Sequence, residues 1–158
     1  MNDLSLVEIA EREFGIVSGN LCSIEMTEMS EQVKNLASSL VKVKACYDNC
    51  FQLAHCLDAT YVLGVTYLAS IPLPIAHAWL KVDGKYIDPT LETVHGDTSE
   101  RTYQKLVEIP VEDIISVVDL VDQITEKGSF APMFESVAHH PLWCDLFTDF
   151  GRRRIQYL

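Results

Sequence analysis

The feature that most constrains the fold of this sequence is an Asp83-Gly84 pair between two runs of alternating residues. The run before it reads IAHAWLKV (75–82), and the run after it reads KYIDPT (85–90). Asp-Gly favours a two-residue turn of type I′, because both turn residues adopt positive φ angles and match the twist of the flanking strands. We therefore predict a β-hairpin over 75–90.

The predicted turn also assigns the side chains of the hairpin to two faces. A two-residue loop places Val82 opposite Lys85, and the same register places Trp79 opposite Asp88 and His77 opposite Thr90. An apolar face, expected in the core, consists of Ala76, Ala78, Leu80 and Val82. The other face consists of His77, Trp79, Lys81, Tyr86 and Asp88. Diagonal neighbours on one face have Cβ atoms about 7 Å apart, so the Asp88 carboxylate is within reach of the His77 imidazole.

An Asp-His pair of this kind holds one imidazole nitrogen and leaves the other for a nucleophile. Cys46 is the best candidate, because it begins a predicted helix and the field at a helix N-terminus favours a thiolate. Cys46, His77 and Asp88 would then be the nucleophile, the base and the group that orients the base. The competing interpretation is that Cys46 is a core residue on an apolar helix face and Asp88 forms a turn before Pro89.

Hydrophobic periodicity predicts the other elements. We expect helices at 5–14, 28–43, 46–59 and 111–124, strands at 61–70 and 105–110, and short helices after Gly128. SIPLP (70–74) is predicted to be an irregular connection because it contains two prolines, and 92–105 is a charged stretch. Helices followed by a small antiparallel sheet predict an α+β fold, with the helix of Cys46 packed on the sheet and one domain over 1–158.

The cysteines favour reduced thiols. Their number is odd and their spacing unpaired, which is typical of a cytoplasmic protein and not of a disulfide framework: Cys22, Cys46, Cys50, Cys56 and Cys144. Cys50 is predicted to be buried one turn beyond Cys46, and Cys56 lies at the helix end, where the dipole has the wrong sign. No C-x-x-C pair is present, so we expect no metal site and no cofactor.

The charge distribution limits the partners. The formal net charge is −11, and residues 88–149 hold thirteen Asp and Glu against three Lys and Arg. Such a surface repels phosphate backbones, so no nucleic-acid partner is expected. No apolar run approaches the ~18 residues of a membrane helix, and the N-terminus lacks the basic start of a signal peptide, so we expect no membrane association. The sequence does not indicate an oligomeric state.

Three segments, CYDNC at a helix start, YVLGVTY, and HAWLKVDGKYIDPT, together resemble the transglutaminase-like branch of the papain-like cysteine enzymes, in a small version like those of bacteria and phages. The resemblance covers 46–90 and implies that Cys46 is the nucleophile, His77 the base and Asp88 the orienting residue. It also implies a papain-like arrangement in which the nucleophile helix packs on the sheet. The backbone N–H of Cys46 would be one oxyanion donor; where papain has a Gln before its Cys, this chain reads SLVKVKA.

The expected function follows from both lines of reasoning. We expect a cysteine-dependent enzyme that acts on an amide or thioester of a protein or peptide through a thioester intermediate: a protease or amidase, a deamidase, or a transglutaminase-like enzyme. Trp79, Tyr47 and Asn49 are the candidate substrate-binding residues, although Trp79 could equally be an ordinary strand aromatic. The alternatives are a non-catalytic protein that sequesters a partner through its acidic C-terminal half, and an acyltransferase with a small-molecule acyl donor.

Overall fold

The computed structural model describes residues 5–68 and 70–156, with side chains up to residue 153. The elements, in chain order, are α1 (Leu6–Phe14), β1 (Cys22–Ile24), α2 (Glu31–Leu40), α3 (Cys46–Leu57), β2 (Thr60–Leu68), β3 (Ile71–Val82), β4 (Lys85–Ile87), α4 (Pro89–His95), β5 (Arg101–Ile109), α5 (Val111–Thr125), α6 (Phe134–Val137), a 3₁₀ turn (Cys144–Leu146) and α7 (Asp149–Gln156). The fold is α+β, as predicted.

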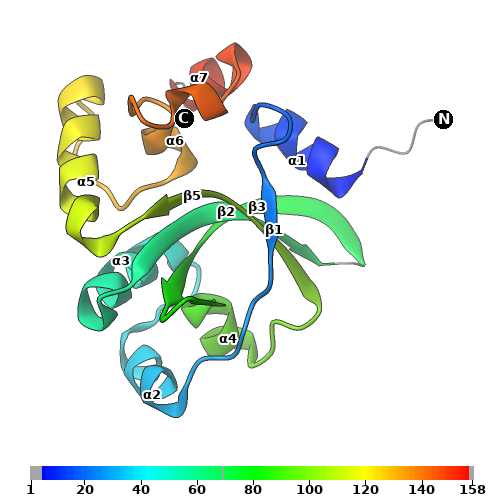
Figure 1. The fold of residues 1–158 in the computed structure, drawn as a ribbon, viewed down its shortest axis with the longest axis vertical. Coiled ribbons are helices and arrows are strands. Elements are labelled where there is room, and N and C mark those ends of the chain that lie inside the picture. The colour runs from blue at the N-terminus through cyan, green and yellow to red at the C-terminus, as the bar shows by residue number, and fades with distance from the viewer. Residues whose placement is uncertain (1–4, 69, 157–158) are drawn as a thin grey trace.

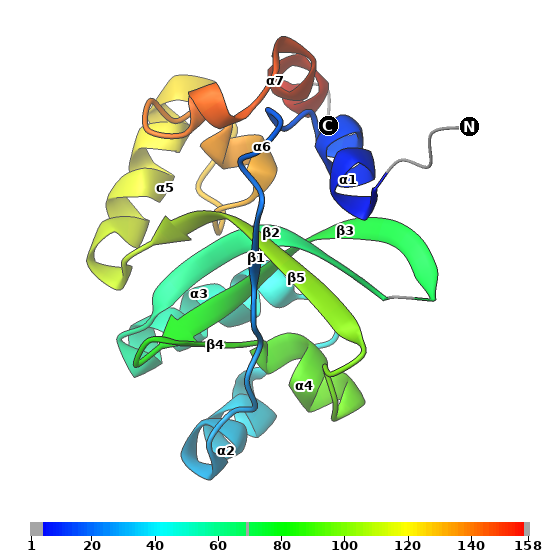
Figure 2. The ribbon, with the colours of Figure 1, turned by 45° about the vertical axis from the view of Figure 1, so that its right-hand side comes forward.

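The strands form a curled antiparallel sheet in the order β1-β5-β2-β3-β4. In two views of the ribbon, α1, α5, α6 and α7 lie toward one end of the molecule, and α2, α3 and α4 lie toward the other (Figures 1 and 2). Helices of both groups contribute to the same main core, for example α3 and α5. The short helices after Gly128 were predicted, and they return to the first helix: the Thr148 N–H donates to the Gly15 carbonyl at 2.8 Å.

The hairpin register is confirmed near the turn and wrong beyond it. Asp83 and Gly84 have φ angles of 50° and 78°, and Val82 pairs with Lys85. The ladder ends where Leu80 pairs with Ile87, so the predicted pairs of Trp79 with Asp88 and of His77 with Thr90 do not form. The reason is local, because Asp88 accepts from the Leu91 N–H and caps α4, whose first residue is a proline.

The first half of β3 corrects a second prediction. Residues 71–74 were predicted to be irregular, yet β3 begins at Ile71 and runs through both prolines. The β2–β3 ladder changes register in this stretch: Thr66 pairs with Ile75, and Leu68 pairs with Ile71, so β3 has extra residues between these two pairs. On the other edge of β3, β4 pairs only over Leu80–Val82. Pro72 and Pro74 therefore lie in an irregular part of the ladder, where proline is tolerated.

The other differences concern strand bounds and one additional strand. β1 was not predicted, and β5 begins at Arg101, inside the stretch described as charged and before the predicted start at residue 105. Its sequence RTYQKLVEI has a charged or polar residue at most positions, which hides the period of two. β2 ends at Leu68, and residue 69 of the predicted strand 61–70 lies outside the described residues.

The two faces of the hairpin are confirmed by their packing. Ala78 and Leu80 are fully buried in the main core, where α3 contributes Cys50 and Leu53. On the opposite face Trp79 forms a smaller cluster with Val62 and Tyr103. Gly64 makes room for this cluster, because a Cβ there would meet the Gln104 carbonyl at 2.2 Å and the Trp79 ring at 2.5 Å.

Candidate active site

The structure joins His77 and Asp88 in the protein interior. Nε2 of His77 lies 2.9 Å from Oδ2 of Asp88, and the side chains are 5% and 0% exposed. The contact was predicted, but it arises differently from the predicted strand pairing, since Asp88 reaches His77 from the N-cap of α4. Asp88 thus caps α4 through Oδ1 and hydrogen-bonds the His77 imidazole through Oδ2.

Tyr103 completes the surroundings of the carboxylate. Its hydroxyl donates to Oδ2 of Asp88 at 2.7 Å, so this one oxygen accepts from a phenol and an imidazole. Sequence analysis missed Tyr103, because it lies in the stretch described only as charged, and the strand was predicted to begin after it, at residue 105. Burial and the Asp88 charge both raise the pKa of Tyr103, so it stays a neutral donor.

The electrostatics favour a protonated His77 at neutral pH. Burial lowers the pKa of His77, but the charge and hydrogen bond of Asp88, together with the side chain of Cys46, raise it to about 9. Together these contributions outweigh the desolvation of the ring, and that of Asp88 is large because the two groups are in direct contact in the protein interior. An imidazolium therefore sits beside the Cys46 thiol.

Cys46 is the first residue of α3 and is partly exposed. Nε2 of His77 is committed to Asp88, so Nδ1 is the nitrogen available to the thiol. The N–H groups of the first helical turn have no partner within the helix, and their field favours negative charge at this position. The structure thus brings together all three residues of the predicted Cys-His-Asp set.

The segment that leads into Cys46 is held by Asn49. The Asn49 amide accepts from the Lys42 N–H at 3.0 Å and donates to the Lys42 carbonyl at 2.8 Å. It also donates to the hydroxyl of Thr90, in α4, at 3.0 Å. We call the hydrogen bonds of the Asn49 side chain to Lys42 and Thr90 the Asn49 clamp. Lys44, between Lys42 and Cys46, has a left-handed φ of 61°, which is uncommon outside glycine. Asn49 was predicted to bind substrate, but its side chain is buried and its hydrogen bonds connect the loop before Cys46 to the helix that Asp88 caps.

Trp79 and Tyr47, the other two predicted substrate contacts, differ in their exposure to solvent. Trp79 shares the face of His77, as predicted, with ring centroids 6.2 Å apart, but it is fully buried and supports the imidazole from within the protein. Its indole N–H has no partner among the described residues. Tyr47 is partly exposed beside Cys46, and burial, followed by the nearby Cys46 and Glu135, raises its pKa. Of the three predicted substrate contacts, Tyr47 alone has exposed surface near the thiol.

The remaining cysteines lie in other environments. Cys50 is fully buried, and burial raises the pKa of its thiol well above the usual value. Cys56 is exposed near the end of α3, as predicted, and Cys144 is partly exposed in the 3₁₀ turn. Within the described residues, no three or more His, Cys, Asp or Glu side chains are grouped so that they could hold a metal ion.

Comparisons with known proteins found no match for this chain among protein-family models, curated proteins or solved structures. In the part of the chain that the structure describes, no helix has both the length and the apolar character needed to cross a membrane.

Proposed function

We propose that this protein is a cysteine-dependent acyl-transfer enzyme that uses Cys46, His77 and Asp88 as a catalytic triad. The observation that carries the proposal is the buried 2.9 Å contact between His77 and Asp88, with Cys46 beside the same imidazole at the start of a helix. Burying two charged groups is unfavourable unless they are paired, and this pair leaves one imidazole nitrogen for a thiol. Such an arrangement orients a base and stabilises a thiolate.

The reaction needs no group beyond these three and a substrate. The Cys46 thiolate attacks the carbonyl carbon of an amide, and the carbonyl electrons move to oxygen near the N–H groups of the first turn of α3. The His77 imidazolium gives its proton to the leaving nitrogen, the C–N bond breaks, and a thioester remains on Cys46. Water or an amine then gives a proton to the neutral imidazole as it attacks the thioester, and the thiolate leaves.

The proposed setting is a transglutaminase-like version of the papain-like fold. The order Cys46, His77, Asp88 along the chain supports it, as does the packing of α3 on the sheet. We propose a protein or peptide as the substrate, and a reducing, cytoplasmic location. All five cysteines are free, which is what a thiol enzyme in that compartment requires.

Competitive alkylation tests the proposal. The folded protein is treated with a limiting amount of iodoacetamide at neutral pH, and mass spectrometry follows each cysteine. Cys46 should react fastest, because it alone combines a helix start with an imidazolium. Cys144 is the matched control, since it is partly exposed, and among its described contacts its thiol meets only oxygen atoms of Pro141 and Asp145.

A His77→Gln variant completes this test. The preference for Cys46 should disappear in it, while labelling of Cys144 stays unchanged. Equal labelling of Cys46 and Cys144 in the wild-type protein, or a preference for another cysteine, would contradict the proposed nucleophile.

A further inference from the structure

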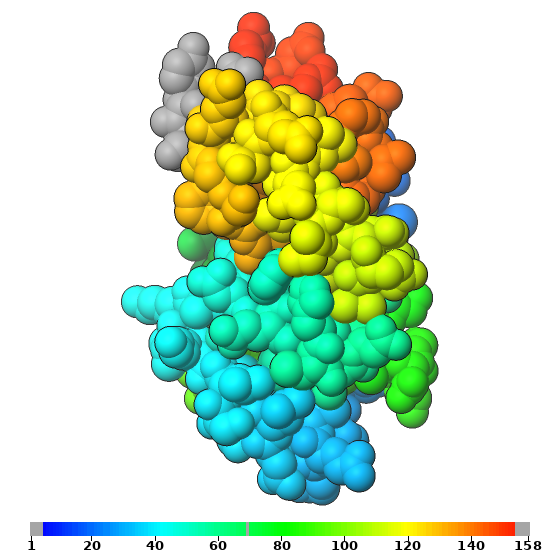
Figure 3. Space-filling model, turned by 90° about the vertical axis from the view of Figure 1, so that its left-hand side faces the viewer, coloured from blue at the N-terminus to red at the C-terminus, as the bar shows by residue number. Residues whose placement is uncertain are grey.

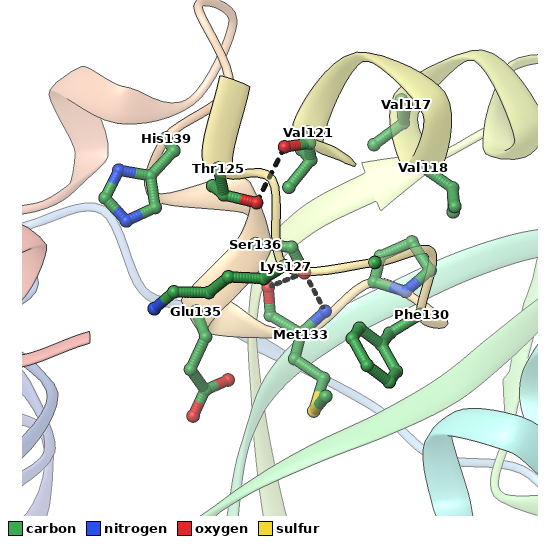
Figure 4. A pocket seen from close by; sticks show the side chains of 12 residues that line it. Val117, Val118, Val121, Thr125, Lys127, Phe130, Met133, Glu135, Ser136 and His139 are labelled. Atoms are coloured by element: carbon green, nitrogen blue, oxygen red, sulfur yellow. Dashed lines mark hydrogen bonds between the residues drawn. The ribbon is translucent and has the colours of Figure 1, made fainter. Parts of the chain in front are cut away.

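A cavity of about 180 Å³ lies between α5, the segment that follows it and α6. Val117, Val118 and Val121 line it from α5, and Phe130 and Met133 line it from the following segment. In the close view, Val118 and Phe130 lie toward one end of the cavity, while Lys127, Glu135 and His139 gather toward the other (Figure 4). The space is therefore apolar at one end and bordered by polar groups at the other.

Two tyrosines connect this cavity to the nucleophile. Tyr47 follows Cys46 in the sequence, and besides burial the charges of Cys46 and of the cavity residue Glu135 raise its pKa. The Tyr61 hydroxyl donates to the carbonyl of the cavity residue Pro132 at 2.6 Å. After burial and Cys50, Cys46 is among the groups whose charges raise the pKa of Tyr61. On the face shown in Figure 3, the surface of α5 (yellow) adjoins that of α3 (teal). The walls of the cavity therefore contact Tyr61 and lie near Tyr47, the residue that follows Cys46.

The size of the cavity selects its occupant. An engineered apolar cavity of about 150 Å³ holds one benzene molecule. The cavity here is slightly larger and has valine, phenylalanine and methionine walls, so it fits one aromatic ring or one branched aliphatic group. A charged group would lose its hydration there without gaining a partner at the valine end.

We propose that this cavity binds an aromatic or branched aliphatic group next to the carbonyl that Cys46 attacks, and so makes the enzyme selective for acyl groups with an apolar side chain. This inference rests on the proposed acyl-transfer function. The apolar group would anchor the substrate, and the polar border would leave the carbonyl outside the valine-lined space, toward Tyr47 and Cys46.

A pair of activated esters tests the selectivity. p-Nitrophenyl acetate and p-nitrophenyl phenylacetate each acylate a thiolate: the bond from Sγ to the carbonyl carbon forms, and p-nitrophenolate leaves. The release of p-nitrophenolate gives the rate, and mass spectrometry locates the acyl group. We expect the phenylacetyl ester to acylate Cys46 faster than the acetyl ester by about 10- to 100-fold beyond their ratio with a free thiol, as hydrophobic pockets discriminate by such factors.

Two variants on α5 provide matched controls. Val118→Phe adds a ring inside the cavity at a partly buried position, so it should remove the preference for the phenylacetyl ester. Ile115→Phe adds the same ring on the same helix at a position that is 50% exposed and outside the cavity. It should keep the wild-type preference.

A binding measurement separates the pocket from the chemistry. In Cys46→Ala, phenylacetamide should shift the NMR methyl resonances of Val117 and Val121 in a saturable way, and this response should be lost when Val118→Phe is added. If both esters acylate Cys46 at their intrinsic ratio and phenylacetamide does not bind, the pocket inference is overturned while the acyl-transfer function stands. If neither ester acylates Cys46, the proposed function fails, and the substrate selectivity fails with it.

Discussion

His77 and Tyr103 donate to the same oxygen of Asp88, at 2.9 and 2.7 Å. The two donors come from different strands, β3 and β5, and the carboxylate comes from the N-cap of α4. A carboxylate with several donors keeps its negative charge in the interior, and each donor fixes its orientation. Tyr103 is therefore a positioning residue for His77.

Removing the Tyr103 hydroxyl should change the titration of His77. In Tyr103→Phe the carboxylate loses one donor, its charge is felt more strongly by the imidazole, and the pKa of His77 should rise above its value of about 9. NMR titration of the His77 ring measures this shift. Tyr86→Phe is the control, because it removes a comparable bond from a phenol to a carboxylate, that of Glu108 at 2.9 Å. An unchanged His77 titration in Tyr103→Phe would show that Tyr103 acts only in packing.

Replacing Asp88 with asparagine should lower the pKa of His77. The fold should survive, because asparagine is as good an N-cap as aspartate and can still accept from the Leu91 N–H. Burial of the ring remains in Asp88→Asn while the charge that raises the pKa is gone, so the pKa of His77 should fall to its ordinary value of 6.5 or below. The alkylation rate of Cys46 at neutral pH should fall with it, since a neutral imidazole supports the thiolate less.

Rate-against-pH profiles of Cys46 alkylation in the wild-type protein and in Asp88→Asn check this prediction. Identical profiles would show that the carboxylate does not act on the imidazole that faces Cys46. Asp88→Ala is a useful third protein, because it loses the helix cap as well, at a cost of about 1 kcal/mol of stability.

The sequence predicted the contact between His77 and Asp88 for partly wrong reasons. The Asp83-Gly84 turn is a local property, so it correctly placed His77 and Trp79 on the face opposite Ala78 and Leu80. The strand was extended too far, because an Asp-Pro pair is compatible with both a strand end and a helix start. The capping role of Asp88 depends on residues that follow it, which the alternating pattern does not include.

Long-range contacts account for what the sequence could not indicate. Tyr103 reaches Asp88 only because β5 inserts between β1 and β2, and strand order does not follow from local patterns. The role of Asn49 was misassigned for a related reason. An amide three residues from a candidate nucleophile can face a substrate or a loop, and only the fold brings Lys42 and Thr90 to it.

The Asn49 clamp should matter for the geometry of the nucleophile and not for substrate contact. Asn49→Ala removes three hydrogen bonds, one of them to the buried Thr90 hydroxyl, which should lower stability by about 1–3 kcal/mol. It should also slow the alkylation of Cys46 by iodoacetamide, a reagent too small to use a substrate subsite. If iodoacetamide reacts normally and only a peptide-like substrate reacts slowly, Asn49 contacts substrate as the sequence first suggested.

Two truncations should separate the site from the scaffold. Leu80→Ala empties a fully buried position of the main core and should lower the free energy of unfolding by about 2–5 kcal/mol. Cys46→Ala should abolish acyl transfer with much less loss of stability, because the thiol is partly exposed. Urea unfolding of the two variants beside the wild type measures both values. Unfolding of Cys46→Ala at low urea would instead identify the thiol as a core group.

The pH dependence of stability should report the ion pair directly, provided that Cys46 is first replaced. The side chain of Cys46 also raises the pKa of His77, so its removal leaves the contribution of Asp88 to be measured alone. In Cys46→Ala the carboxylate of Asp88 stays beside the His77 ring, and we expect it to keep the pKa of His77 above the 6.5 of an unfolded chain. Between pH 6.5 and the pKa of His77 in the folded state, the native protein keeps a proton on His77 that the unfolded chain has released.

The free energy of unfolding of Cys46→Ala should therefore be highest, as far as His77 contributes, below pH 6.5. It should fall as the pH rises through the folded pKa of His77, which should lie below the wild-type value of about 9 because the contribution of Cys46 is gone. The slope should be on the order of 1 kcal/mol per pH unit. Urea unfolding across this range, compared with Cys46→Ala/His77→Gln, isolates the histidine contribution, because the buried thiol of Cys50 affects both proteins equally. Parallel curves for the two proteins would mean that the pKa of His77 is not raised in the folded state, and the imidazolium in the proposed mechanism would then have no support.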